Sequence, residues 1–173
     1  MAFIEQTLLP VLTVIGWLFI ILHLGFLVYK RFVTKLSPLC VRYKKFMERR
    51  GLLLGWIVAL VATLGSLYYS EVLNYLPCKL CWFQRVMIYP QSLILLIAMI
   101  RRSRSIFWYV LPLNVISALI SGYHYVLQRL ANLGTCGGPV DCSITYTFKY
   151  GFITIPFMAF TAALLIILFT RKD

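Results

Sequence analysis

Long, uninterrupted runs of apolar residues dominate the pattern of this chain. Five such runs can be read, at residues 8–28, 52–72, 82–100, 106–127 and 152–170. Each is close to the roughly 20 residues that cross a hydrocarbon core of about 30 Å. Because lipid offers the backbone no hydrogen-bond partners, each run is expected to be an α-helix. The pattern predicts an all-α membrane protein with five spans.

The overall composition agrees with a membrane protein. The chain is 61% hydrophobic and only 13% charged, whereas soluble domains carry about 25% charged residues. A net charge of +12 would suggest nucleic acid as a partner for a soluble protein. Here the basic residues cluster between apolar runs, so they indicate membrane topology and no nucleic-acid partner.

The basic residues alternate from one side of the membrane to the other. Thirteen of the 17 Lys and Arg residues follow the first, third and fifth runs; the others are Lys79, Arg85, Arg129 and Lys149. The positive-inside rule therefore predicts an outside N-terminus and a cytoplasmic C-terminus. The N-terminus lacks the basic start of a signal peptide, so the first span is expected to be retained. Residues 37–50 form a basic cytoplasmic stretch that opens with Ser37-Pro38, a plausible helix start. It could lie on anionic lipid headgroups, or it could be a solvated connector that enforces topology.

The five cysteines are divided unevenly by this topology. Cys78 and Cys81 lie at the outer start of the third span, and Cys136 and Cys142 lie in the outer loop before the fifth span. Disulfides persist on that side of the membrane. Cys40 lies on the reducing side and is expected to have no redox role. Two close pairs outside are what a disulfide relay requires.

The first pair carries the signs of a reactive centre. Pro77 precedes Cys78 at the expected helix start, and cysteines three residues apart share one helical face. The positive end of a helix favours a thiolate, which is the nucleophile in C-x-x-C motifs. Arg85 follows Cys81 by four residues and therefore lies on the same face. An arginine inside the membrane is costly, so it is expected to be paired or functional. The alternative is an arginine that merely snorkels to the interface.

One histidine lies at a matching depth. His124 is near the outer end of the fourth span, and both it and Arg85 are expected about 6 Å below the outer boundary. Two polar side chains at this depth on consecutive antiparallel helices could face one pocket. The alternative is a structural histidine, which is also the interpretation we favour for His23 in the first span.

The second pair has five residues between its cysteines, including the turn residues at 137–139. A bridge across so short a loop adds only modest entropic stabilisation, which argues against a purely structural staple. A short disulfide in a glycine-rich loop is accessible to an attacking thiolate. The partly apolar segment 140–150 could rest on the membrane surface and carry the pair toward Cys78.

Two stretches resemble one known family. The run Pro-Cys-Lys-Leu-Cys-Trp-Phe-Gln-Arg at residues 77–85 is similar to the signature of the DsbB/BdbC membrane disulfide-forming oxidoreductases, and residues 123–128 resemble the end of that family's third core helix. The similarity covers about residues 51–172. It implies a four-helix oxidoreductase core at residues 51–173. Residues 1–50 would be an additional N-terminal transmembrane helix with a basic cytoplasmic connector.

The resemblance also implies an activity in the cytoplasmic membrane. Such a protein reoxidises a thioredoxin-fold partner of the DsbA type and passes the electrons to a membrane quinone, either ubiquinone or menaquinone. This supports disulfide formation in exported proteins. A DsbA-type dithiol lies near −120 mV, so its reoxidation needs an acceptor of higher potential than glutathione pools. A quinone dissolved in the bilayer meets that need.

Residue roles follow from the same resemblance, with redox-active disulfides Cys78–Cys81 and Cys136–Cys142. The partner's thiolate would attack Cys136, and Cys142 would complete the loop disulfide. Cys78 would exchange with the loop pair, and Cys81 would react with the quinone. Three further residues are implied to bind the quinone: Arg85, His124 and, more weakly, Gln84. No metal is expected. The second pair is closer together here than in the best-known members of the family, which leaves open which loop cysteine faces the partner.

The sequence also allows three other functions. A vitamin K epoxide reductase-like enzyme also couples cysteine pairs to a quinone, but its loop pair precedes the membrane pair. A metal-binding membrane protein could hold zinc with four thiolates, although an oxidising exterior favours disulfides. A structural membrane protein could use both pairs as staples.

Overall fold

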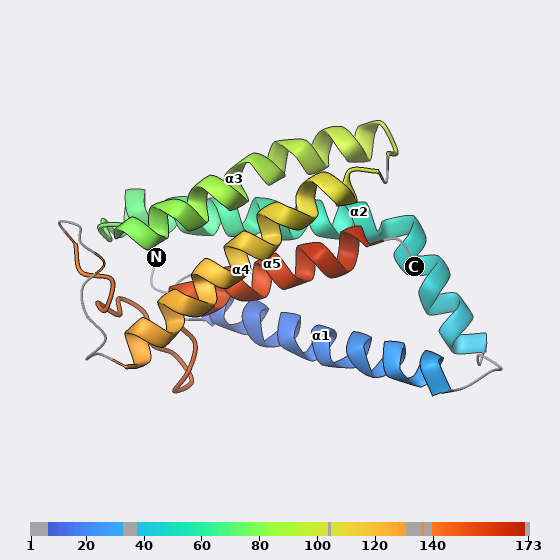
Figure 1. Cartoon of the computed structure of the whole chain (residues 1–173), viewed down its shortest axis with the longest axis horizontal. Coiled ribbons are helices and arrows are strands. Elements are labelled where there is room, and N and C mark those ends of the chain that lie inside the picture. Colours follow the sequence, from blue (N-terminus) through green and yellow to red (C-terminus); the bar gives the residue numbers. More distant parts are fainter. Residues whose placement is uncertain (1–6, 33–37, 104, 131–135, 137–139, 172–173) are drawn as a thin grey trace.

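Five α-helices form most of the described part of the chain in the computed structural model shown in Figure 1. The structure describes residues 7–32, 38–103, 105–130, 136 and 140–171. The helices are α1 (Leu9–Phe32), α2 (Pro38–Leu67), α3 (Lys79–Ile100), α4 (Phe107–Arg129) and α5 (Ile155–Thr170), and the π-helical segment η2 (Tyr68–Val72) continues α2. Helices α1 to α4 are long and apolar enough to cross a membrane, and α5 is a shorter apolar helix. The predicted all-α membrane fold is confirmed.

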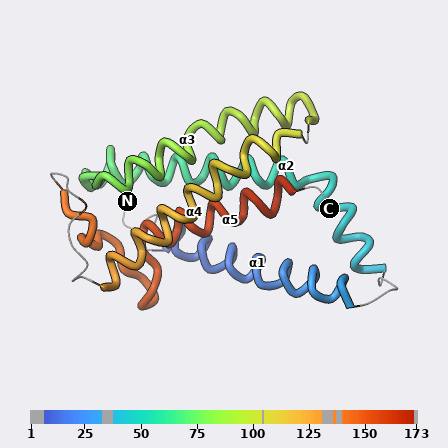
Figure 2. Tube along the Cα trace, viewed as in Figure 1, coloured from blue at the N-terminus to red at the C-terminus, as the bar shows by residue number. Residues whose placement is uncertain are grey.

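Helix α5 lies at the centre of the packing. It packs against α1, α2 and α4, while α3 packs mainly against α2 and α4. Every residue of α5 is buried or half-buried, as expected for a helix that is apolar all around its circumference. Helices α2 to α5 thus form a bundle, and α1 lies along its outside against α5 (Figure 2).

Helix α2 begins earlier than the predicted second span. It starts at Pro38, so the basic segment that precedes residue 52 is helical, and a proline in the first turn favours that start. Met47 in this segment packs in one cluster with Ile20 of α1 and Phe169 of α5. Tyr43 lies beside the buried His23, with 2.7 Å between its hydroxyl and Nδ1. These contacts agree with a structural His23.

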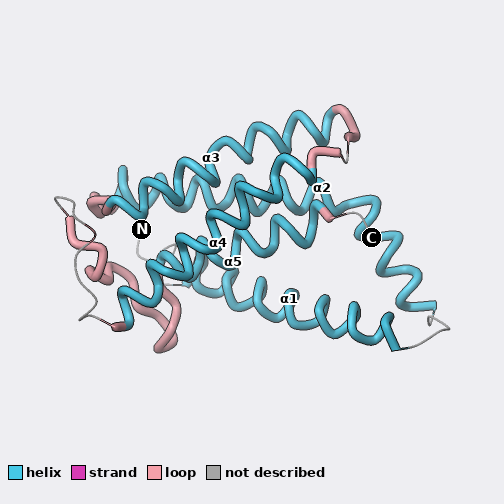
Figure 3. The backbone as a smooth tube through the Cα atoms, viewed as in Figure 1, coloured by secondary structure: helices cyan, strands magenta, loops and turns pink. Residues whose placement is uncertain are grey.

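The connections between helices differ at the two ends of the bundle. The described part of the α4–α5 loop lies at the same end as the start of α3, whereas the turn between α3 and α4 lies at the opposite end (Figure 3). Both cysteine pairs therefore belong to one end of the molecule, as the alternation of spans predicts.

Polar contacts join α3 to α4 deep in the bundle. Asn114 donates to the side-chain oxygen of Gln91 at 2.7 Å and to the Val110 carbonyl at 2.9 Å. Both Asn114 and Gln91 are completely buried. Hydrogen bonds between membrane helices contribute about 0.6 kcal/mol on average and up to about 1.7 kcal/mol. This pair therefore helps to fix the register of α3 against α4.

We expect Asn114→Ala to lower the free energy of unfolding in detergent by about 1 kcal/mol, because the Gln91 amide loses its buried partner. Leu119→Ala is a suitable control, since Leu119 lies on the same helix and is 69% exposed. Unfolding of both variants in mixed micelles would be followed by circular dichroism. Equal losses in the two variants would contradict a specific role for the buried pair.

Candidate active site

Cys78 caps the N-terminus of α3. Its backbone is extended, and its Sγ accepts a hydrogen bond from the Cys81 backbone N–H at 3.4 Å. Pro77 precedes this cap and so lies just outside the helix rather than in its first turn. A sulfur at this position faces the free N–H groups and the positive end of the helix. The local structure therefore stabilises a thiolate at Cys78.

The two sulfurs of the first pair lie against each other without being bonded. Cys78 Sγ and Cys81 Sγ are 2.9 Å apart, and Cys78 is only 4% exposed. The Cys81 thiol, which donates to Cys78, holds the pKa of Cys78 well below its usual range. Burial opposes this change, and His124 adds to it. Cys78 is the deprotonated member of the reduced pair.

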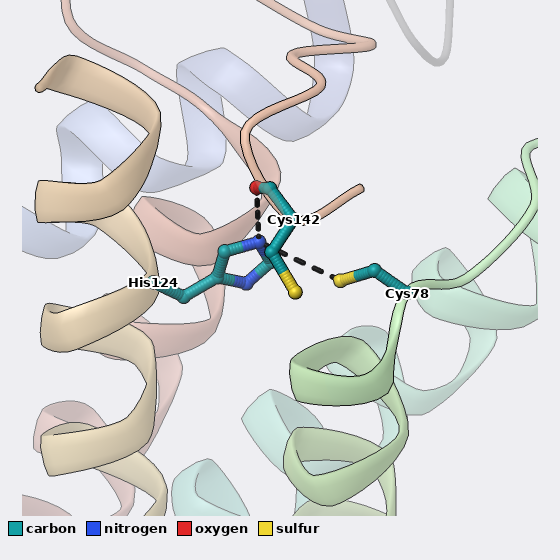
Figure 4. Close-up of side chains that lie close together, drawn as sticks. All are labelled: Cys78, His124 and Cys142. Carbon is teal, nitrogen blue, oxygen red and sulfur yellow. Dashed lines mark hydrogen bonds between the residues drawn. The ribbon is translucent and has the colours of Figure 1, made fainter. Parts of the chain in front are cut away.

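His124 of α4 joins the first pair to the outer loop. Its Nε2 lies 3.1 Å from the Cys142 carbonyl oxygen and 3.6 Å from Cys78 Sγ, as Figure 4 shows. Its Nδ1 lies 3.1 Å from the side-chain nitrogen of Gln84 on α3. Because a carbonyl oxygen only accepts, Nε2 carries the hydrogen, and Nδ1 accepts from the Gln84 amide. His124 is therefore a neutral donor aimed at both Cys142 and Cys78.

The second pair lies on top of the first. Cys136 and Cys142 form a disulfide, while residues 137–139 between them lie outside the described residues. Cys142 is buried against Cys78 and Leu127, whereas Cys136 is half-buried. The sulfurs of Cys78 and Cys142 and a ring nitrogen of His124 all lie within 4.8 Å of one another. Cys142 is thus the loop cysteine that faces the membrane pair.

This cluster also has the residue types of a metal site, but its chemistry is that of a disulfide. Cys78, His124 and Cys142 each offer one ligand atom. Zinc is bound by thiolate sulfur, and the sulfur of Cys142 is already bonded to Cys136. The arrangement therefore fits thiol exchange better than metal binding.

Arg85 points away from this cluster, toward α2. Its Nε donates to Ser66 Oγ at 3.1 Å, and its Nη2 donates to the Ser66 carbonyl at 3.3 Å. The Tyr89 hydroxyl donates to the same Ser66 Oγ at 3.0 Å. The guanidinium also lies 5.4 Å from the centre of the Trp82 ring. These contacts hold a cation, whose burial in the membrane would otherwise be costly, in one orientation.

A cavity of about 390 Å³ opens beside Arg85. Cys81, Gln84, Arg85 and Tyr89 line its polar end, and apolar side chains of α1, α2 and α5 line most of the remainder. His124 is not among the described residues that line this cavity. It borders a separate small pocket together with Cys78 and Cys81. Arg85 and His124 therefore do not share the one pocket that their matching depth allowed, and Cys81 borders both pockets.

The helical angle explains this separation. Gln84 and Arg85 are consecutive on α3, so their side chains leave the helix about 100° apart. Gln84 reaches His124 on α4, and Arg85 reaches Ser66 on α2. Sequence reasoning missed Ser66 and Tyr89. Tyr89 is four residues after Arg85 on one helical face, which was an available signal, whereas no local pattern marks Ser66.

Comparisons with known proteins match this chain to disulfide bond formation proteins. The family model described as "Disulfide bond formation protein DsbB" matches residues 48–165. Disulfide bond formation protein C of Bacillus subtilis is 47% identical over 118 residues, which cover 66% of this chain and 86% of that protein. A probable disulfide formation protein of Oceanobacillus iheyensis is 45% identical over 119 residues, covering 66% and 82% of the two chains. One from Coxiella burnetii is 40% identical over 129 residues, covering 72% and 88%. No solved structure matches the chain.

The environment of Cys78 predicts how the midpoint of its titration in the reduced protein should change from one variant to another. Because its pKa is lowered, the thiolate persists as pH falls from neutral and is lost only in acid. Cys81→Ala removes the largest cause and should move the midpoint upward most, and His124→Ala should move it upward less. The ultraviolet absorbance of the thiolate, with Cys78→Ser as the blank, measures this. An unchanged midpoint in Cys81→Ala would contradict the assigned donor.

Proposed function

Because this chain belongs to the DsbB family of disulfide bond formation proteins, we propose that it reoxidises a DsbA-type thioredoxin-fold partner and transfers the electrons to a membrane quinone. The observation that carries this proposal is the position of Cys81. Its partner Cys78 lies within 4.8 Å of the loop disulfide at Cys142, and Cys81 itself lines the cavity that holds Arg85. One cysteine pair thus contacts both an electron donor and a site for an acceptor.

The first half of the cycle is exchange at the loop pair. The partner's thiolate attacks Cys136, the half-buried loop cysteine, which forms a mixed disulfide and releases Cys142 as a thiolate. The partner's second thiolate then attacks the mixed disulfide, so the partner leaves oxidised and Cys136 is released. The loop pair now holds two electrons. Burial of Cys142 against Cys78 directs the attack to Cys136.

The second half moves these electrons to the membrane pair. Cys142 attacks Cys78 of an oxidised Cys78–Cys81 pair and releases Cys81; Cys136 then attacks Cys142 and releases Cys78. The result is a bonded loop pair above a reduced Cys78 and Cys81, which is the state in the structure. Closing Cys78–Cys81 again gives up two electrons and two protons. A quinone, when bound, accepts both.

His124 is assigned here to exchange between the pairs. Its N–H holds the Cys142 carbonyl and faces Cys78 Sγ. It therefore positions Cys142 for its attack and stabilises the Cys78 thiolate that is released in the next step. The resemblance had implied a contact between His124 and the quinone, and that contact stays a prediction. Gln84 orients the His124 ring and also lines the cavity, so it connects the two environments.

The cavity suits a quinone ring. Its volume of about 390 Å³ lies in the range of roughly 300–1,000 Å³ that is usual for small-molecule sites. Its walls are mostly apolar, and its polar end brings the Arg85 guanidinium next to Cys81. Arg85 would stabilise negative charge on the Cys81 sulfur and on the acceptor oxygen as electrons transfer.

The direction of the chain in the membrane completes the proposal. The distribution of Lys and Arg supports an orientation in which the N-terminus and both redox pairs lie outside and the C-terminus lies in the cytoplasm. The cytoplasmic membrane is the location at which exported proteins, an oxidising exterior and quinones meet. Residues 51–173 would carry the oxidoreductase core, and residues 1–50 would add α1 and the basic part of α2.

Removing Cys81 should stop electron transfer to the acceptor. We expect purified Cys81→Ser to show no quinone reduction when supplied with a reduced DsbA-type partner, measured by the absorbance change of the quinone. Arg85→Ala should lower acceptor turnover by about 100-fold, the scale of losing one electrostatic stabiliser, while loop exchange continues. Cys40→Ser is the control and should behave like the unchanged protein. Full activity in Cys81→Ser would contradict the role assigned to Cys81 in electron transfer. It would favour the alternative of a protein with two structural disulfides.

The burial of the loop pair predicts which cysteine meets the partner. A DsbA-type partner that retains only its attacking cysteine should form a mixed disulfide with Cys136, since Cys142 is 1% exposed. Peptide mass spectrometry of the trapped complex identifies the sulfur involved. A complex formed mainly through Cys142 would reverse the proposed order of exchange.

A further inference from the structure

Helix α1 lies outside the segment that the family model matches, yet it contributes to the active site. The match begins at residue 48, whereas α1 spans Leu9–Phe32. Leu12, Gly16 and Phe19 of α1 line the same cavity as Cys81 and Arg85. We propose that α1 builds a channel for the polyprenyl tail of the quinone whose ring lies beside Cys81. This inference rests on the proposed function and names the part of the acceptor that α1 recognises.

Specific contacts fix α1 on the bundle. Trp17 donates from its indole nitrogen to Thr161 Oγ1 of α5 at 2.9 Å, and its ring stacks on Phe157 and Phe160. At Gly16 the two helices approach so closely that an added Cβ would lie 2.9 Å from a methyl carbon of Leu165. Close approach at a small residue is typical of tightly packed membrane helices. The α1 wall of the cavity therefore has a defined register.

The cavity is elongated along the helices. On α2 its lining includes Leu54, Val58, Val61 and Ser66, and the first and last of these are separated by about 18 Å at 1.5 Å per residue. The lining residues of α1 extend from Leu9 to Phe19, which corresponds to about 15 Å. A ring alone does not need walls of this length. A ligand with a linear apolar extension does.

The two ends of the cavity differ in chemistry. At the polar end Arg85, Ser66 and Tyr89 supply polar groups, and a Cβ on Gly65 would lie 3.4 Å from two methyl carbons of Leu9. Helices α1 and α2 thus meet beside the polar end. At the other end the lining residues Phe19 and Leu54 belong to an apolar cluster with Phe169. A polar head at Arg85 would therefore continue into an apolar tail between α1 and α2.

The difference between the polar and the apolar end of the cavity indicates which ligand it holds. A ring beside Cys81 would carry its substituent away from the polar end, where apolar side chains of α1, α2 and α5 line the cavity. Polyprenyl tails are the linear apolar substituents of membrane quinones. A phospholipid acyl chain has the same apolar character, but its binding would not be coupled to a ring at Cys81. The continuity of the channel with the redox site favours the tail.

The test uses substitutions to phenylalanine that narrow the channel from two helices and leave the residues of the polar end unchanged. Leu12→Phe narrows it from α1, and Ala62→Phe narrows it from α2. Val115→Phe is the matched control, because Val115 is exposed on α4 and is not among the described lining residues. The full-length protein, in detergent with a reduced DsbA-type partner, would be given one naphthoquinone ring with or without a polyprenyl tail.

We expect both channel variants to lose about tenfold or more in kcat/KM with the tailed acceptor, and to stay within about twofold with the tail-less one. Val115→Phe should change neither. An equal loss with both acceptors would mean that the substitutions disturb the ring site, and no loss with either would mean that the tail lies elsewhere or that a lipid fills the channel. Both results overturn the inference. If the unchanged protein reduced neither acceptor, the proposed function itself would fail.

Discussion

The hydrogen bond from His124 to the Cys142 carbonyl is the contact on which the redox geometry depends. It joins α4 to the outer loop in a completely buried position, where an unpaired carbonyl costs about 1–3 kcal/mol. Gln84 of α3 holds the other ring nitrogen, so two helices and the loop meet at one imidazole. The same N–H faces Cys78. The contact that positions the loop disulfide therefore also stabilises the Cys78 thiolate, with which we propose that the loop disulfide exchanges.

Two different chemistries are kept apart on α3. On one side, Cys78 faces the loop disulfide and a neutral donor; on the other, Cys81 borders a mostly apolar cavity with one cation. Thiol exchange needs close sulfurs and a stabilised leaving thiolate. Electron transfer to a membrane acceptor needs an apolar site with fixed charge. Because Cys78 and Cys81 are a single helical turn apart, the proposed transfer of electrons between these environments needs no large movement of the helices.

Much of this arrangement follows from the sequence, and the rest depends on tertiary contacts. Long apolar runs and alternating basic clusters predict the helices and bring both cysteine pairs to one end, because lipid restricts the backbone to helices. Matching depth suggested that His124 and Arg85 could face one pocket. It could not show that Arg85 turns toward Ser66 while His124 turns toward Cys142, because rotation about a helix axis is set by packing. Hydropathy does not mark the helical basic segment before residue 52, because it detects only apolar runs, but Ser37-Pro38 did mark a plausible helix start there.

The juxtaposition of Cys78 and Cys142 can be measured without partner or quinone. In the double variant Cys81→Ser with Cys136→Ser, each pair retains only the cysteine that faces the other pair. Mild oxidation of the purified monomer, followed by peptide mass spectrometry, reports which disulfide forms. We predict an intramolecular Cys78–Cys142 bond in most molecules. In the matched variant Cys81→Ser with Cys142→Ser, which retains Cys136 instead, a Cys78–Cys136 bond should form in far fewer molecules. Failure of Cys78 to bond with Cys142, or equal bonding with Cys136, would contradict the proposed path of electrons.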